Sequence, residues 1–213
     1  MEIYTSFGVI VNMKKPNTYL PPTKYLMLIL LFLFAFGERV LFDLGPNIEL
    51  VTTVMILSSF YFAKRQAFWL TFAVLAFSDV IIGNTNIFIF TWSGFLIPAF
   101  LASKVFRKVF KNLTTNRQLL TTIFSLTIFG LSSNIFFYLW TNFGVWYLGT
   151  MYPKTIAGLL SSYINALPFL RYQMISTLIF VPAGFLFTEL TIYLIYKFQL
   201  KQKVSRELSF IYK

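Results

Sequence analysis

The sequence predicts an all-α integral membrane protein, built as a bundle of six transmembrane helices. Of its 213 residues, 57% are hydrophobic and only 12% are charged, a composition outside the range of ordinary soluble domains. The apolar residues gather into segments close to the ~20 residues that cross a bilayer core as a helix. The 18 Lys and Arg residues fall mostly between these segments. Together these observations indicate several membrane spans and short connections.

Six segments are apolar enough to be expected as spans. In chain order they are Tyr25–Phe42, Ile48–Phe62, Ala67–Ile82, Ile87–Phe106, Leu119–Leu139 and Gln173–Phe198. The second and third are short and are joined by a tight basic turn. Residues 1–24 are expected to form a cytoplasmic lead-in and residues 199–213 a basic cytoplasmic tail, so residues 25–198 form one membrane domain.

The stretch before the last span does not fit this pattern. Residues 155–169 are mildly apolar, but Ser161, Ser162, Asn165 and Pro168 interrupt them. The segment is also shorter than a span, and a seventh crossing would place the basic C-terminus outside. We therefore predict a short interfacial or re-entrant helix on the outer face, where irregular backbone must be covered by protein or line a cavity.

The positions of the basic residues predict the orientation. All of them except Arg39, Lys154 and Arg171 fall on the side that both termini share. Cytoplasmic loops carry an excess of Lys and Arg. We therefore expect a multi-pass protein of the bacterial inner (cytoplasmic) membrane, with both termini cytoplasmic.

The composition also excludes several kinds of chemistry. The chain has neither Cys nor His, which removes disulfides, thiolates and the commonest catalytic base and metal ligand. It has no Gly-rich phosphate-binding loop of the Walker type. The net charge of +11 comes from short basic runs between spans and not from one basic surface, so nucleic acid is not an expected partner. We expect no enzyme activity, no metal and no cofactor.

Polar residues that the topology places on the outer side suggest a binding site. The segment from Gly37 to Glu49 holds the acids Glu38, Asp43 and Glu49, and Asp79 ends the third span on the same side. Acceptors, amides and flat aromatic rings suit a pocket for a small polar heterocycle or a cationic metabolite. The substrate-binding candidates are Asn47, Glu49, Asp79, Asn84, Asn134, Trp140, Asn142 and Trp146.

A structural interpretation of the same residues stays open. Glu38 and Arg39 can simply pair with other outer-face charges, and tryptophans are enriched at any membrane interface. Glu189, deep in the last span, is expected to pair with a basic residue near the inner side and not to touch the substrate.

Two parts of the chain resemble known membrane families. Pro46–Thr53, with the basic turn and Ala76–Gly83, resembles the second and third spans of substrate-binding S components of energy-coupling-factor (ECF) transporters. Thr141–Trp146, with Met151–Pro153 and Ala166–Phe169, resembles an uncharacterised bacterial membrane family similar to those S components.

The resemblance implies a six-helix protein that captures a vitamin or micronutrient precursor from outside. It also implies a coupling protein and ATPase subunits as partners, with the lipid bilayer around the bundle. The matched positions nearest the implied pocket are Asn47, Glu49, Asp79, Asn84, Trp140 and Asn142. The first span departs from the family: Leu31–Gly37 is too bulky to match the Ala-x-x-x-Ala face on which S components often dock their coupling protein.

Two other functions remain open at this point. A non-catalytic membrane scaffold or cell-envelope organising protein would have a collapsed outer face without a ligand cavity. A stand-alone facilitator or ion-coupled carrier would have acids near mid-membrane and not clustered at one end.

Overall fold

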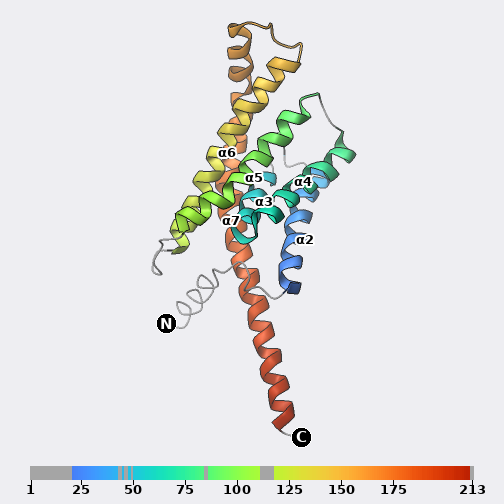
Figure 1. Cartoon of the computed structure of the whole chain (residues 1–213), viewed down its shortest axis with the longest axis vertical. Coiled ribbons are helices and arrows are strands. Elements are labelled where there is room, and N and C mark those ends of the chain that lie inside the picture. The colour runs from blue at the N-terminus through green and yellow to red at the C-terminus, as the bar shows by residue number, and fades with distance from the viewer. Residues whose placement is uncertain are drawn as a thin grey trace.

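The computed structural model describes residues 21–42, 45, 48, 50–83, 86–110 and 118–211. Within these ranges, all regular secondary structure is helical (Figure 1). The elements are α2 (Pro21–Gly37), the π-helix η1 (Glu38–Phe42), α3 (Val51–Tyr61), α4 (Lys64–Ile82), α5 (Phe88–Phe110), α6 (Gln118–Leu148) and α7 (Ile156–Ile211). The all-α class predicted from composition is therefore confirmed.

Five helical segments are long and apolar enough to cross a membrane. They are Tyr25–Phe42, Lys64–Ile82, Phe88–Val109, Leu119–Leu148 and Ile156–Ile195. The expected second span is the exception, because α3 has only 11 residues and is about 16 Å long at 1.5 Å per residue. Ile48 and Leu50, which the prediction counted in that span, precede the helix. The chain is thus a multi-pass membrane protein, but six complete spans are not confirmed.

The short helix α3 lies at the centre of the bundle (Figure 1). Ten of its eleven residues are buried, and it contacts α2, α4, α5, α6 and α7. Its Met55, Ile56 and Leu57 are among the most deeply buried side chains of the protein. A helix that is apolar on all sides must be enclosed by protein or lipid, and here the other helices enclose it.

Two glycines allow the helices α6 and α7 to approach α3 closely. A Cβ atom on Gly130 of α6 would lie 2.7 Å from Ile56 Cδ1, and one on Gly184 of α7 would lie 3.0 Å from Leu57 Cδ1. Small residues permit such close helix packing in membranes. The core of the bundle is therefore built around α3 by backbone proximity as well as by large side chains.

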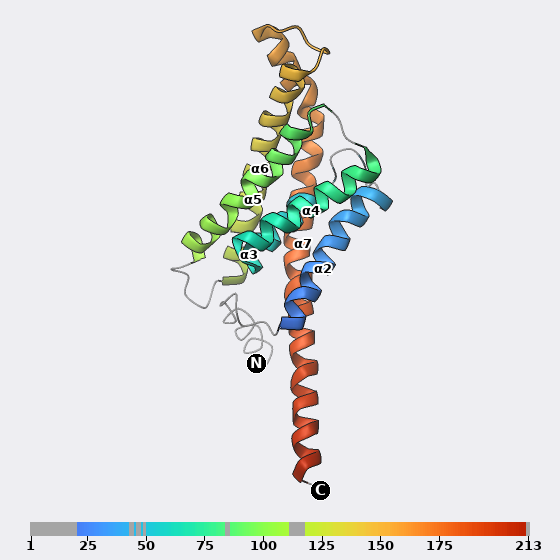
Figure 2. The same ribbon diagram turned by 45° about the vertical axis from the view of Figure 1, so that its right-hand side comes forward.

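The helices α6 and α7 form a long hairpin that rises above the other helices, while the C-terminal part of α7 extends below them (Figures 1 and 2). The apolar windows of these two helices contain 30 and 40 residues, about 45 and 60 Å of helix. Both exceed the ~30 Å hydrocarbon core of a bilayer, whereas α2, α4 and α5 match it more closely.

The separate interfacial or re-entrant helix predicted at residues 155–169 is wrong. The helix α7 is continuous from Ile156 to Ile211 and passes through Pro168 and Pro182. The two serines that the prediction treated as interruptions form hydrogen bonds within the helix. Ser161 Oγ donates to Ala157 O, and Ser162 Oγ donates to Leu159 O. A hydroxyl that bonds within its own helix does not end it. The helix α6 also extends to Leu148, beyond the predicted end at Leu139.

Candidate functional site

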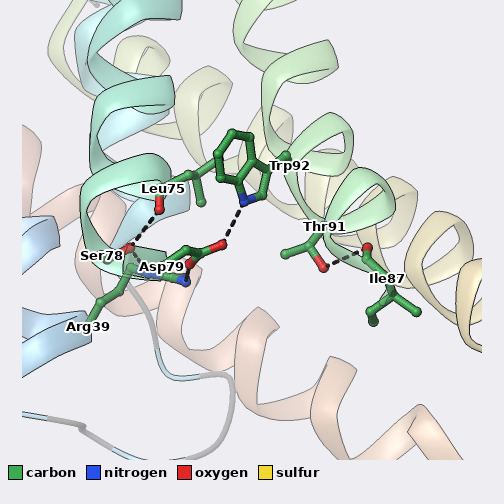
Figure 3. Close-up of polar contacts among 7 residues, drawn as sticks. All are labelled: Arg39, Leu75, Ser78, Asp79, Ile87, Thr91 and Trp92. Carbon is green, nitrogen blue, oxygen red and sulfur yellow. Dashed lines mark hydrogen bonds and ion pairs between the residues drawn. The ribbon is translucent and has the colours of Figure 1, made fainter. Parts of the chain in front are cut away.

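A charged cluster joins η1, α4 and α5 at one end of the apolar bundle (Figure 3). Arg39 Nη2 lies 2.8 Å from Asp79 Oδ1, and Arg39 Nε donates to Ser78 Oγ at 2.8 Å. Trp92 Nε1 donates to Asp79 Oδ2 at 2.6 Å. The Arg39 and Asp79 side chains are only 15% and 9% exposed. Both oxygens of this carboxylate are therefore engaged by side chains of the chain itself.

The π-helix η1 positions this cluster. It follows α2 directly and carries Glu38 and Arg39 as neighbours. Glu38 is buried, and its Oε2 accepts a hydrogen bond from the backbone N–H of Leu50 at 3.0 Å, just before α3 begins. A carboxylate there favours the start of a helix. One residue of η1 thus holds the beginning of α3, and the next binds the last turns of α4. Short π-helices occur frequently at functional sites.

The cluster offers three kinds of recognition. The Arg39 guanidinium suits a carboxylate or phosphate, and the Asp79 carboxylate suits a cationic group. The Trp92 ring packs edge-on against Phe72 and Phe88, with centroids 5.5 and 6.0 Å apart. Among the described residues, no group of three or more acids is arranged to hold a metal ion.

Of the eight predicted site residues, Asn47, Glu49 and Asn84 lie outside the described ranges, and Asp79 lies in the cluster. Trp140 in α6 donates from Nε1 to Ser93 Oγ at 2.8 Å. Because Ser93 follows Trp92 in α5, consecutive residues of α5 bond Trp140 and Asp79. The structure therefore links these two predicted residues through one turn of α5.

The tip of the α6–α7 hairpin holds two further candidates. Trp146 Nε1 donates to the carbonyl of Pro153 at 3.0 Å, in the connection between the two helices. Asn142 Nδ2 donates to Tyr138 O of its own helix at 2.8 Å. Both contacts are local, and neither brings its side chain to Asp79.

Asn134 has a different setting, in the middle of the bundle. It is fully buried, and its Nδ2 donates to Thr177 Oγ1 at 2.7 Å and to Gln173 O at 3.1 Å. Its Oδ1 accepts a hydrogen bond from Thr52 Oγ1 at 3.4 Å. Asn134 therefore connects α3, α6 and α7, as a buried polar network does when it fixes helix packing.

The expectation that Glu189 pairs with a basic residue is wrong. Its Oε1 accepts a hydrogen bond from the Tyr61 hydroxyl at 2.6 Å, and the two residues are 7% and 4% exposed. Among the described residues, Glu189 Oε2 has no hydrogen-bond partner. The sequence did contain a signal, because an acid inside an apolar span is costly and commonly functional, but spacing alone did not identify Tyr61.

Two apolar grooves lie on the surface of the bundle. One, of about 460 Å³, is lined by residues from α4 and α5 that include Phe68, Trp92 and Phe100. The other, of about 410 Å³, is lined by residues of α2, by Glu38 and Phe42 of η1, and by Leu50. Each groove thus reaches one residue of the charged end, although its walls are otherwise almost entirely apolar.

The fold and these contacts define a multi-pass helical membrane protein with a charged cluster at one end of its bundle. The chain belongs to a family of unknown function, DUF6580, whose model matches residues 21–199. No curated protein and no solved structure matches the chain.

Proposed function

We propose that this protein is the substrate-capture subunit of a small-molecule uptake transporter, similar to the S components of ECF transporters. The observation that carries the proposal is the Arg39–Asp79 ion pair, held with Trp92 between η1, α4 and α5. Ionisable groups kept at the end of an apolar bundle are costly and mark ligand or ion sites. The resemblance of Pro46–Thr53 and Ala76–Gly83 to the S components supports the same assignment.

In this proposal the ligand is a vitamin or micronutrient precursor with a cationic group. The cationic group displaces Arg39 from Asp79, and the apolar body of the ligand enters the groove beside Trp92. That groove, of about 460 Å³, falls within the usual size of small-molecule sites. Three further predicted residues would add hydrogen bonds to the ligand. Asn47 and Glu49 are close in sequence to Leu50, whose backbone N–H binds Glu38, and Asn84 follows Asp79 by five residues.

The proposed direction of transport follows from the basic residues. With both termini cytoplasmic, the Arg39–Asp79 end of the bundle faces outward in the bacterial inner membrane. Energy for inward release would come from a coupling protein and ATPase subunits, because the sequence lacks a nucleotide-binding loop.

A thermal-stability screen of the full-length protein in detergent, with vitamins and nucleobase precursors, tests the proposal. A cationic ligand should raise the Tm of the wild type by several degrees, since binding to the native state alone stabilises it. Asp79→Asn should abolish that shift, and Glu207→Gln, which removes an acid from the C-terminal part of α7, should retain it. A screen without any ligand effect, or an Asp79→Asn protein that keeps the shift, would contradict the proposal.

One observation favours a second candidate, a non-catalytic scaffold for other membrane or cell-envelope factors. Asp79, Trp140, Asn142 and Trp146 all bond to groups of this chain, as expected for an outer face packed against itself. A scaffold predicts that no small molecule changes the Tm. It also predicts that Asp79→Asn lowers the stability of the protein without affecting any ligand.

A further inference from the structure

A second buried carboxylate lies at the other end of the bundle. Glu189 of α7 is bonded through Oε1 to the hydroxyl of Tyr61, the last residue of α3. The helix α4 begins three residues later at Lys64 and reaches Asp79 after 15 residues, about 22 Å along its axis. The Tyr61–Glu189 pair is therefore a separate site from the Arg39–Asp79 cluster.

Glu189 is incompletely satisfied in either protonation state. As an anion it has one neutral donor, Tyr61, and its Oε2 has no partner among the residues that the structure describes. As a neutral acid protonated on Oε1 it could donate to the Tyr61 hydroxyl oxygen, whereas one protonated on Oε2 would carry a buried O–H without an acceptor among the described residues. Buried charges and buried polar groups both need partners. In either state Oε2 therefore has no partner among the described residues, and it is the oxygen available to bind a proton.

The elements around Glu189 provide no counter-charge that is seen to reach it. The helix α3 contains no charged residue, and Tyr61 is its one titratable side chain. The helix α6 likewise has no charged residue, and its tyrosines, Tyr138 and Tyr147, lie toward the hairpin tip.

The remaining neighbours are α2 and α7 itself. The helix α2 touches α7 through Phe34 and Phe187, and its ionisable residues, Lys24 and Tyr25, lie at its beginning. On α7, Tyr193 follows Glu189 by one turn, and the exposed Lys197 follows by two. No ion pair joins Lys197 to Glu189 in the described part of the chain.

The Tyr61–Glu189 pair lies close to the end of the bundle where α3 meets α4. Tyr61 and Phe62 are buried, but Ala63 and Arg65 of the following turn are exposed. Tyr61 is therefore only two positions along the chain from an exposed residue, Ala63. The positive-inside orientation places this turn on the cytoplasmic side.

We propose that Glu189 is a reversible proton-binding site and that Tyr61 is its positioning residue. A hydronium ion transfers its proton to Oε2 of the carboxylate, leaving water and a neutral carboxylic acid, and the reverse step releases the proton. Tyr61 donates to Oε1 and so stabilises the anionic form. Because this hydrogen bond joins α3 to α7, proton occupancy changes the strength of the contact between these helices. Such a site makes the contact between α3 and α7 sensitive to pH.

Infrared difference spectroscopy of the full-length protein in zwitterionic nanodiscs, between alkaline and acidic buffer, tests the proposal. The wild type should gain the carbonyl band of a neutral carboxylic acid on acidification, and Glu189→Gln should lack that band. Glu207→Gln is the matched control and should keep it. Tyr61→Phe should keep the band but form it over a different pH range, because the anion loses its donor. A purely structural Glu189 would give identical difference spectra in the wild type and Glu189→Gln.

A second measurement needs no variant to fold. A hydrophobic carbodiimide adds to a neutral buried carboxylic acid and forms an N-acylurea that retains all atoms of both reactants. Mass spectrometry of wild-type peptides should find this adduct on Glu189 at acidic pH and lose it as the pH rises. Absence of the adduct at every pH, or labelling that does not depend on pH, would overturn the proposal. Neither experiment contains a transport ligand, so a failed ligand screen leaves this result unaffected.

Discussion

Asp79 and Glu189 are both largely buried carboxylates in an apolar helical bundle, but their partners differ. Asp79 has a cationic partner on one oxygen and an indole N–H on the other. Glu189 has one phenol hydroxyl and no partner on its second oxygen. The two carboxylates are therefore buried to a similar extent, but only Asp79 has a cationic partner in the described structure. The comparison teaches that burial of an acid in a membrane helix does not by itself indicate what the acid does.

The difference follows from where each acid lies on its helix. Asp79 is in the last turn of α4, where η1 and α5 converge and can each supply a side chain. Glu189 lies against the last residue of α3, and neither α3 nor α6 contains a charged residue. Three elements that meet at Asp79 supply it with a cationic partner and an indole N–H, whereas the helices around Glu189 supply one neutral donor, Tyr61.

Asp79→Asn should have the largest effect on stability. It removes the carboxylate charge that pairs with Arg39, whose side chain is only 15% exposed, and breaking one side of a buried ion pair costs about 3–5 kcal/mol. Denaturant unfolding of the full chain in mixed micelles would measure the loss. The double variant Arg39→Gln/Asp79→Asn should lose less than the sum of the two single variants. Additive losses would contradict a direct Arg39–Asp79 interaction.

Tyr61→Phe should have the next largest effect. It removes the one donor seen on the Glu189 carboxylate, and a hydrogen bond to a charged group contributes about 1.5–3 kcal/mol. The loss, measured by the same unfolding assay, should be greater in alkaline than in acidic buffer, since the anion needs the donor more. In a Glu189→Gln background the loss should be smaller. If the loss of stability in Tyr61→Phe depends neither on pH nor on the presence of Glu189→Gln, Tyr61 does not act through the charge of Glu189.

The neighbouring residues Thr52 and Thr53 provide a matched pair with opposite expected signs. Thr53 Oγ1 is buried without a hydrogen-bond partner in the described structure, whereas Thr52 Oγ1 donates to Asn134. Thr53→Val should therefore raise the free energy of unfolding by about 1 kcal/mol, and Thr52→Val should lower it by about 1 kcal/mol. If both variants change the free energy of unfolding in the same direction, the two hydroxyls have the same environment, which would contradict the described contacts.

Glu189→Gln should have the smallest effect, below about 1 kcal/mol. The amide oxygen still accepts the Tyr61 hydrogen bond, while the cost of burying a charge disappears. The contrast with Asp79→Asn in the same assay is the direct test of the comparison. A loss as large as that of Asp79→Asn would reveal a cation that neutralises Glu189.

Much of the helical pattern was predictable from apolar length. The predicted spans Ala67–Ile82 and Ile87–Phe106 agree closely with α4 and α5. The prediction failed for α3, which is about half the length of a span, because hydropathy records that a segment is apolar and not whether lipid or protein surrounds it. It failed for residues 155–169 because serine hydroxyls that look polar in sequence bond within α7.

For the candidate site, sequence identified individual residues better than their partners. Asp79 and Asn134 were singled out, and both have dense hydrogen bonding in the structure. Arg39 pairs with Asp79, in line with the structural interpretation that outer-face charges pair with one another. Tyr61 was not identified, since 128 residues separate it from Glu189 and no local spacing relates them.

The sequence by itself determined that this chain is a helical membrane protein and that its few acids require partners. Apolar segments of sufficient length and the cost of isolated charge in hydrocarbon are sufficient for both conclusions. Only the tertiary structure decided that α3 is enclosed by protein, that α7 is one continuous helix, and that Arg39 binds Asp79 while Tyr61 binds Glu189. The enclosure of α3 depends on how closely the helices approach one another, which Gly130 and Gly184 permit, and the two polar contacts join residues that are far apart in the sequence.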